Sequence, residues 1–124
     1  MKITRKLCIF DFIFEVIFGA IFIILIILMK EPTSLIEGLP IGMGGGAIVY
    51  YFLRKRNLDE RDYYLYYKVN HFTLGAVILG IVAAKLMNDI PAVSEFIQVN
   101  WSQMIILVFF LFHGLFGLIL FLKK

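Results

Sequence analysis

Four long apolar segments constrain this chain more than any other feature of its sequence. They cover residues 8–29, 34–53, 69–87 and 101–122. A bilayer core about 30 Å thick is crossed by roughly 20 helical residues rising about 1.5 Å each, and each segment approaches that length. Lipid offers no partners for backbone N–H and C=O groups, which excludes open strands. The sequence therefore predicts an all-α integral membrane protein, an up-and-down four-helix bundle formed by one domain, residues 1–124.

The composition favours the same environment. Hydrophobic residues make up 61% of the 124 residues, whereas soluble domains contain roughly 45–50%. A soluble chain this small would leave too much of that apolar surface in water. The net charge of +3 does not indicate nucleic-acid binding, because the basic residues gather at the ends of the predicted spans. The single cysteine, Cys8, excludes an internal disulfide framework.

Lysine and arginine are unequally divided between the two ends of the predicted spans. One end has only Lys30 and Lys85, and the other has ten basic residues. Cytoplasmic loops carry the excess of positive charge in membrane proteins. We therefore expect an inner (cell) membrane protein with both termini and the middle loop in the cytoplasm. The ten residues are Lys2, Arg5, Lys6, Arg54, Lys55, Arg56, Arg61, Lys68, Lys123 and Lys124.

The connections carry their own signals. Asp59 is placed to cap the third helix, which would then begin before the membrane. The longest connection is predicted over residues 88–100, where Pro91 interrupts the chain and residues 93–99 suggest a short interfacial helix.

Three glycines in the second predicted span are spaced by four residues. Gly38, Gly42 and Gly46 therefore share one helical face, and small residues at this spacing let membrane helices approach closely. We expect this face to pack against another span of the chain. A homodimer seam, or an unwound segment lining a cavity, are the alternatives.

Four ionisable side chains lie within the predicted spans. Asp11 and Glu15 are one turn apart in the first, His71 is just inside the third, and His113 is in the fourth. Counted from the nearest cytoplasmic basic residue, Glu15 and His113 lie about 13 and 15 Å deep, and Asp11 and His71 about 7 and 5 Å. Charges inside spans are costly and face protein or water. We expect Glu15 and His113 to meet, with the other two one layer nearer the cytoplasm.

Several chemistries fit these candidate proton- or ligand-binding residues. A hydrogen-bonded pair fixing helix register is one, and a proton-carrying or cation-coupled site is another. A metal site is a third, although only Asp11 and Glu15 have tight spacing. Haem held by His71 and His113 is a fourth, and their unequal depth argues against it. We expect no cofactor and leave a metal open. No nucleophile constellation is present, so we expect no enzyme activity.

Residues 59–69 resemble a feature of small prokaryotic multi-span membrane proteins of unknown function. Those proteins carry Asp-Glu-Arg ahead of a span, then an aliphatic residue, a lysine and a small residue at fixed spacing. Asp59, Glu60, Arg61 and Lys68 match that pattern, while the final residue is larger than usual. The resemblance covers eleven residues and implies a family without an assigned activity. A helix cap followed by solvated charges is the alternative interpretation.

A second resemblance is to small multidrug exporters, which also have four spans and a membrane glutamate early in the first, and which work as dimers. Glu15-Val16-Ile17 lies in the comparable place. The tryptophan- and proline-containing motifs of their central spans are not found here, and the charge asymmetry is stronger, so the exporters serve as an analogy.

The leading hypothesis is a non-enzymatic membrane protein that uses Glu15 and His113 in proton- or cation-coupled transport or in small-ligand binding. The rival is an accessory, immunity or regulatory membrane subunit that acts through residues 57–68 and the glycine face. The partners expected are the lipid bilayer and a second copy of the chain or another membrane protein.

Overall fold

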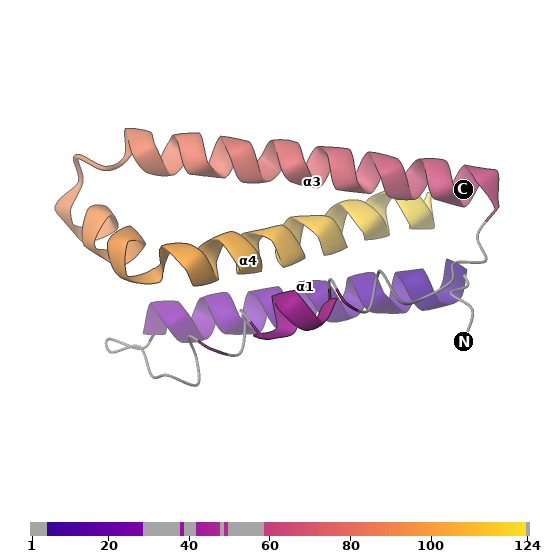
Figure 1. Ribbon diagram of the computed structural model, residues 1–124, viewed down its shortest axis with the longest axis horizontal. Helices are drawn as coiled ribbons and strands as arrows, with labels where there is room; N and C mark the ends of the chain where they lie inside the picture. Colours follow the sequence, from indigo (N-terminus) through magenta and orange to yellow (C-terminus); the bar gives the residue numbers. More distant parts are fainter. Residues whose placement is uncertain (1–4, 29–37, 39–41, 48, 50–58, 124) are drawn as a thin grey trace.

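Three long helices form the framework of the molecule. The computed structural model describes residues 5–28, 38, 42–47, 49 and 59–123. Helix α1 covers Arg5–Leu28, α3 covers Glu60–Leu86 and α4 covers Pro91–Leu122. Figure 1 shows them running side by side, with the start of α1 and the end of α4 at the same end of the bundle. We call this end, which holds Arg5 and Phe121, the terminal end, and the other the loop end.

The prediction of an all-helical chain is confirmed for the described residues, which contain no strand. Each of α1, α3 and α4 is long and apolar enough to cross a membrane. They correspond to the first, third and fourth predicted spans. The second predicted span, residues 34–53, lies largely outside the described residues, and residues 38, 42–47 and 49 within it are helical.

The start of α3 follows from local hydrogen bonding. Asp59 has extended backbone angles, and its side-chain oxygen accepts a hydrogen bond from the Asp62 N–H at 2.8 Å. This satisfies one of the N–H groups that a helix leaves unpaired in its first turn. Glu60 and Asp62 place negative charge in that turn and Lys85 places positive charge in the last, as the helix dipole favours. The predicted cap at Asp59 is confirmed.

The start of α4 corrects the sequence prediction. Residues 93–99 do not form a separate interfacial helix, because α4 runs without interruption from Pro91 to Leu122. Pro91 begins the helix instead of breaking it: it follows Ile90, whose backbone is extended, and a proline at the first helical position loses no hydrogen bond. The link between α3 and α4 is therefore only Met87–Ile90.

Helices α1 and α4 approach each other closely through two glycines of α4. A Cβ built on Gly114 would lie 2.7 Å from the Phe12 carbonyl oxygen, and one built on Gly117 would lie 2.4 Å from the Phe12 ring. A smaller constraint of the same kind applies at Gly19, where a Cβ would lie 3.3 Å from the Leu107 carbonyl oxygen. Because glycine has no side chain, the backbones of α1 and α4 can approach closely at these positions.

The glycines singled out in the sequence behave differently. A Cβ on Gly38, Gly42 or Gly46 would meet no atom within 4 Å, and all three residues are exposed. None of the three therefore makes a close contact with another described residue, and the packing of this face against another span stays a prediction. The homodimer seam stays a prediction.

Helix α3 is held mainly by its first half. Its buried residues are Asp62, Tyr66, Val69 and Thr73. Val69 and Tyr66 join a core cluster at the terminal end that contains Cys8, Phe12 and Phe121. A second cluster, nearer the loop end, contains Phe18, Ile26, Leu107 and Phe110 and no buried residue of α3. The second half of α3 therefore packs loosely on α4.

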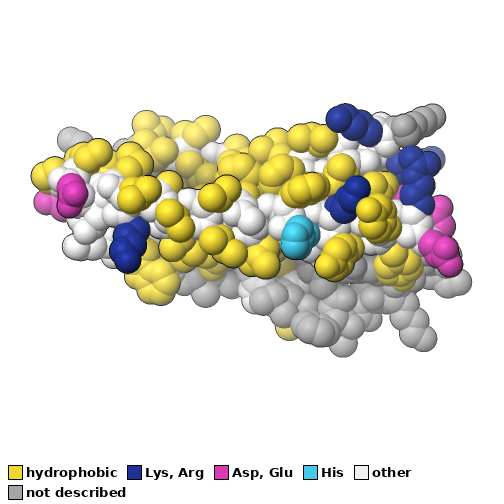
Figure 2. Space-filling view, turned by 90° about the horizontal axis from the view of Figure 1, so that it is seen from above, with side chains coloured by type: hydrophobic (Ala, Val, Ile, Leu, Met, Phe, Trp, Pro, Cys, Tyr) yellow, Lys and Arg dark blue, Asp and Glu magenta, His cyan; other side chains and the backbone are white. Residues whose placement is uncertain are grey.

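The outer surface is apolar over most of its length. Figure 2 shows hydrophobic side chains along the middle of one face, with the acidic side chains confined to its two ends. Exposed apolar side chains occur on all three long helices, for example Phe10, Leu79 and Trp101. A surface of this kind is unfavourable in water and suits a lipid environment.

Candidate functional site

A carboxyl–imidazole pair lies buried between α1 and α4. His113 Nδ1 is 2.6 Å from Glu15 Oε2, close enough for the two atoms to share one proton in a hydrogen bond. Only 5% of Glu15 and 2% of His113 is exposed. The depth estimate from the sequence had placed these two residues at one level, and the structure brings them into contact.

The second ring nitrogen of His113 reaches α3. His113 Nε2 lies 2.9 Å from Asn70 Oδ1. An amide oxygen can only accept, so this contact places a proton on Nε2. Asn70 itself is exposed. The site therefore joins all three long helices, and Asn70 connects the buried pair with the outside of the bundle.

Aromatic rings enclose the imidazole. The ring of Phe109 stacks on His113 with centroids 5.3 Å apart, and the rings of Phe12 and Tyr66 meet it edge-on at 5.5 and 5.8 Å. Phe12 and Tyr66 are themselves buried. These rings keep water from the Glu15–His113 hydrogen bond, and in such surroundings a hydrogen bond is stronger than in water.

The glycine crossing sets the geometry of the pair. Gly114 follows His113 directly, and a Cβ at Gly114 would lie 3.0 Å from the Val16 backbone nitrogen, next to Glu15. The backbones of α1 and α4 therefore approach closely at the level of the two polar side chains. A carboxyl group and an imidazole reach 2.6 Å because no side chain separates the backbones there.

The proton count defines what the pair can do. With Nε2–H directed at Asn70, one further proton lies between His113 Nδ1 and Glu15 Oε2. The pair is neutral overall whether this proton sits on nitrogen, giving two opposite charges, or on oxygen. Adding or removing a proton leaves one net charge in an apolar interior, which is unfavourable without a counter-charge.

The other two predicted site residues lie on α1 and α3. Asp11 is half-buried one turn before Glu15, towards the terminal end of α1. His71 is exposed on α3, and its ring stacks on that of Tyr67 with centroids 6.2 Å apart. The participation of Asp11 and His71 in a shared site stays a prediction.

The arrangement of donors bears on the metal and haem alternatives. In the part of the chain that the structure describes, no three His, Cys, Asp or Glu side chains converge on a point where they could hold a metal ion. Both ring nitrogens of His113 are already hydrogen-bonded, and His71 faces outward. An axial haem ligand needs a free ring nitrogen, so this geometry disfavours haem between the two histidines.

The residues of the Asp-Glu-Arg motif lie along the start of α3. Asp59 caps the helix, while Glu60 and Arg61 are exposed. The Lys68 ammonium lies 4.7 Å from the centre of the Tyr64 ring, a cation–π contact. These four residues do not converge on one point. Asp59, Glu60 and Arg61 are exposed at the start of α3, and Lys68 is partly exposed further along the helix.

Sequence reasoning missed an ionic contact beside this motif. Arg5 Nη2 donates a hydrogen bond to the Phe121 carbonyl oxygen at 2.6 Å, and Arg5 Nη1 lies 3.3 Å from Asp62 Oδ1. Asp62 is only 5% exposed. Arg5 thereby neutralises a buried carboxylate of α3 and caps the last turn of α4. In the sequence Arg5 was visible only as one of ten basic residues.

No protein-family model matches the chain, and no curated protein or solved structure shows significant similarity to it.

Proposed function

We propose that this chain is a multi-pass inner-membrane protein with cytoplasmic termini, without enzyme activity, whose Glu15–His113 pair exchanges a proton in coupled transport of a cation or binding of a small ligand. The observation that carries the proposal is the buried 2.6 Å contact between Glu15 and His113. Ionisable residues within a membrane span usually serve ion or substrate pathways.

The charge balance explains why exchange would be coupled. When the shared proton leaves, the Glu15–His113 pair carries one negative charge in an apolar interior. A cation or a cationic ligand entering the site offsets that charge, and its departure favours proton return. Asn70 supplies the contact through which the buried imidazole meets the exposed side of α3. Competition between a proton and a cation for one site is the simplest form of coupling.

Proton flux in reconstituted vesicles tests this proposal. Vesicles that contain the protein and a trapped pH-sensitive dye are given an opposing Na⁺ or K⁺ gradient. We expect the dye to report proton movement in the wild-type protein and not in Glu15→Gln, which keeps the size and the hydrogen-bonding capacity of the side chain but cannot ionise. Glu60→Gln, at an exposed position on α3, is the matched control and should behave as wild type.

A purely structural pair gives a different result. If the Glu15–His113 hydrogen bond only fixes helix register, Glu15→Gln retains a partner for His113 and leaves any flux unchanged. Wild-type flux in a folded Glu15→Gln protein would therefore refute the proposal.

The exposed start of α3 supports a second candidate function, that of an accessory, immunity or regulatory subunit. Glu60, Arg61, Tyr63, Tyr64 and Tyr67 are all exposed there, and clustered tyrosine and arginine are typical of protein interfaces. Under this alternative, Arg61→Glu should lose a specific co-purifying membrane protein and Glu15→Gln should keep it. Loss of the co-purifying protein in Glu15→Gln but not in Arg61→Glu would favour the proton site.

A further inference from the structure

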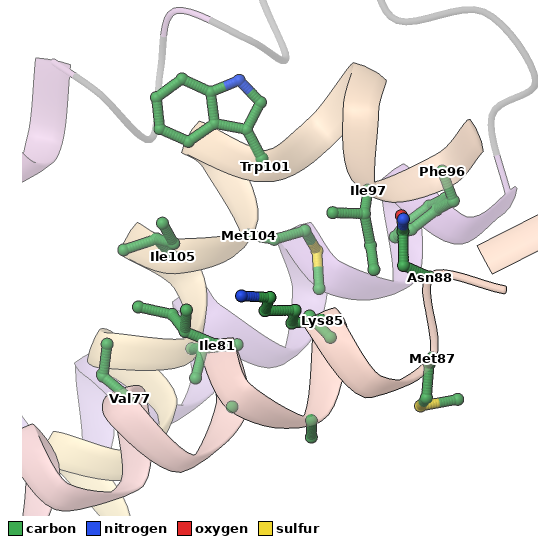
Figure 3. Close-up of a pocket in the computed structure, with 14 residues that line it drawn as sticks. Val77, Ile81, Lys85, Met87, Asn88, Phe96, Ile97, Trp101, Met104 and Ile105 are labelled. Carbon is green, nitrogen blue, oxygen red and sulfur yellow. The ribbon is translucent and has the colours of Figure 1, made fainter. Parts of the chain in front are cut away.

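An apolar groove lies between the second half of α3 and the first half of α4. Its volume is about 640 Å³, within the range of roughly 300–1,000 Å³ typical of small-molecule sites. Figure 3 shows its walls: Ile81 and Lys85 come from α3, and Trp101, Met104 and Ile105 come from α4. None of Glu15, His113 and Asn70 is among the residues that line the groove.

Small side chains explain why the groove exists. Gly80, Ala83 and Ala84 line it from α3, and a Cβ built on Gly80 would meet no atom within 4 Å. The buried residues of α3 all precede this stretch. The helices are therefore joined firmly near the terminal end, while near the loop end the small residues leave space between them.

One charged side chain lines this apolar groove. Lys85 is the only ionisable residue among the described residues that line the groove, and Figure 3 shows it extending into the space between α3 and α4. No described carboxylate forms an ion pair with it. The amide of Asn88 is also at the groove. The groove is therefore apolar along its length and carries an ammonium group at one end. A phospholipid is built in the same way, with long apolar chains and a charged headgroup.

We propose that this groove binds one phospholipid, with an acyl chain along the apolar walls and the phosphate against Lys85. The proposal rests on the membrane location proposed above, but not on the activity of Glu15 and His113. Lys85 lies in the last turn of α3, the level at which a spanning helix meets the headgroups. Asp89 and Glu95 lie at the same end, so a zwitterionic headgroup, whose ammonium balances them, fits better than a purely anionic one.

The single tryptophan of the chain provides the probe. Trp101 lines the groove, and bromine atoms on a lipid chain quench tryptophan fluorescence at close range. The purified full-length protein in detergent micelles is titrated with dibrominated phosphatidylcholine at low lipid-to-detergent ratios. A specific site gives quenching that saturates, whereas random partition into the micelle gives quenching that rises linearly.

Two pairs of variants separate the groove from its surroundings. Gly80→Leu fills the groove and should abolish saturable quenching; Gly75→Leu, at another open position on α3 that does not line the groove, should keep it. Lys85→Gln should need several-fold more lipid for half-saturation. Lys68→Gln, at the other end of α3, should match wild type, as should Glu15→Gln.

The headgroup is tested with two further probes. A brominated fatty alcohol lacks the phosphate and should quench wild type and Lys85→Gln equally. Glycerophosphocholine lacks the chains and should not compete; competition would show a site for a soluble phosphate ester and overturn the lipid proposal. Saturable quenching in Gly80→Leu, or wild-type affinity in Lys85→Gln, would overturn it as well. Loss of flux in Glu15→Gln with retained quenching separates this site from the proton site.

Discussion

His113 Nδ1 lies 2.6 Å from Glu15 Oε2 because the next residue of α4, Gly114, lets the backbones of α1 and α4 approach at that level. Polar contact and helix crossing therefore depend on each other. The hydrogen bond joins a buried carboxyl group of α1 to a buried imidazole of α4, and the glycine provides the space that a short bond requires.

Replacing Gly114 with alanine should destabilise the protein. The added Cβ would lie 2.7 Å from the Phe12 carbonyl oxygen, a backbone atom that moves only with α1. We expect a loss of about 1–3 kcal/mol, as for overpacked cores. Unfolding in mixed detergent–SDS micelles, followed by circular dichroism, measures it. Gly75→Ala is the matched control, since a Cβ there meets nothing within 4 Å. Equal stability of Gly114→Ala and wild type would contradict the crossing geometry.

Removal of the Asn70 amide should leave His113 with an unpaired nitrogen. In Asn70→Val the Nε2–H of His113 loses its acceptor at 2.9 Å, and a buried unsatisfied donor costs about 1–3 kcal/mol. The ¹⁵N spectrum of the imidazole should change at Nε2 and keep the Nδ1 signal of the Glu15 contact. A double-mutant cycle with His113→Gln tests the coupling: additive costs would show that Asn70 and His113 do not interact.

The length of the apolar segments predicted much of this fold from the sequence. A helix satisfies its own backbone groups within one segment in lipid, and segments of about 20 apolar residues have the length of a spanning helix, so the apolar segments sufficed to predict α1, α3 and α4. The cap at Asp59 followed from a local hydrogen bond. Counting residues from the ends of the spans put Glu15 and His113 at one level, and these two side chains are in contact in the structure. Depth accumulates along a helix in fixed steps, so it can be counted without knowing which helices are neighbours.

Contacts that depend on helix rotation could not be predicted in this way. The regular spacing of Gly38, Gly42 and Gly46 drew attention to a face that makes no close contact within the described chain, whereas Gly114 and Gly117, spaced by three, make the crossing. Glycine spacing identifies a face but not its partner. The contact of Asn70 with His113 could not be predicted from the sequence, because it depends on how α3 turns toward α4.

Arg5 should stabilise the terminal end more than its neighbour Lys6 does. Arg5→Gln removes the cation 3.3 Å from Asp62 Oδ1 and the donor to the Phe121 carbonyl. Breaking a fully buried pair costs about 3–5 kcal/mol. The Arg5 side chain is 35% exposed, so we expect a smaller loss of about 1–3 kcal/mol.

The same micelle unfolding assay measures this effect, and Lys6→Gln, at an exposed position, is the control. Asp62→Asn should restore part of the loss in Arg5→Gln, since it removes the stranded negative charge. Failure of Asp62→Asn to restore any stability would show that the ion pair is not what Arg5 contributes.

The charge asymmetry predicts the orientation, and the two ends of the bundle offer matched positions for testing it. Asn88 at the loop end and Lys123 at the terminal end are both exposed. In a Cys8→Ala chain, which has no other cysteine, a cysteine at position 88 should react with a membrane-impermeant maleimide on intact cells. One at position 123 should react only after permeabilisation, because ten of the twelve basic residues belong to the predicted cytoplasmic side. Labelling of position 123 on intact cells would show the opposite orientation, with the Lys85 groove at the cytoplasmic face.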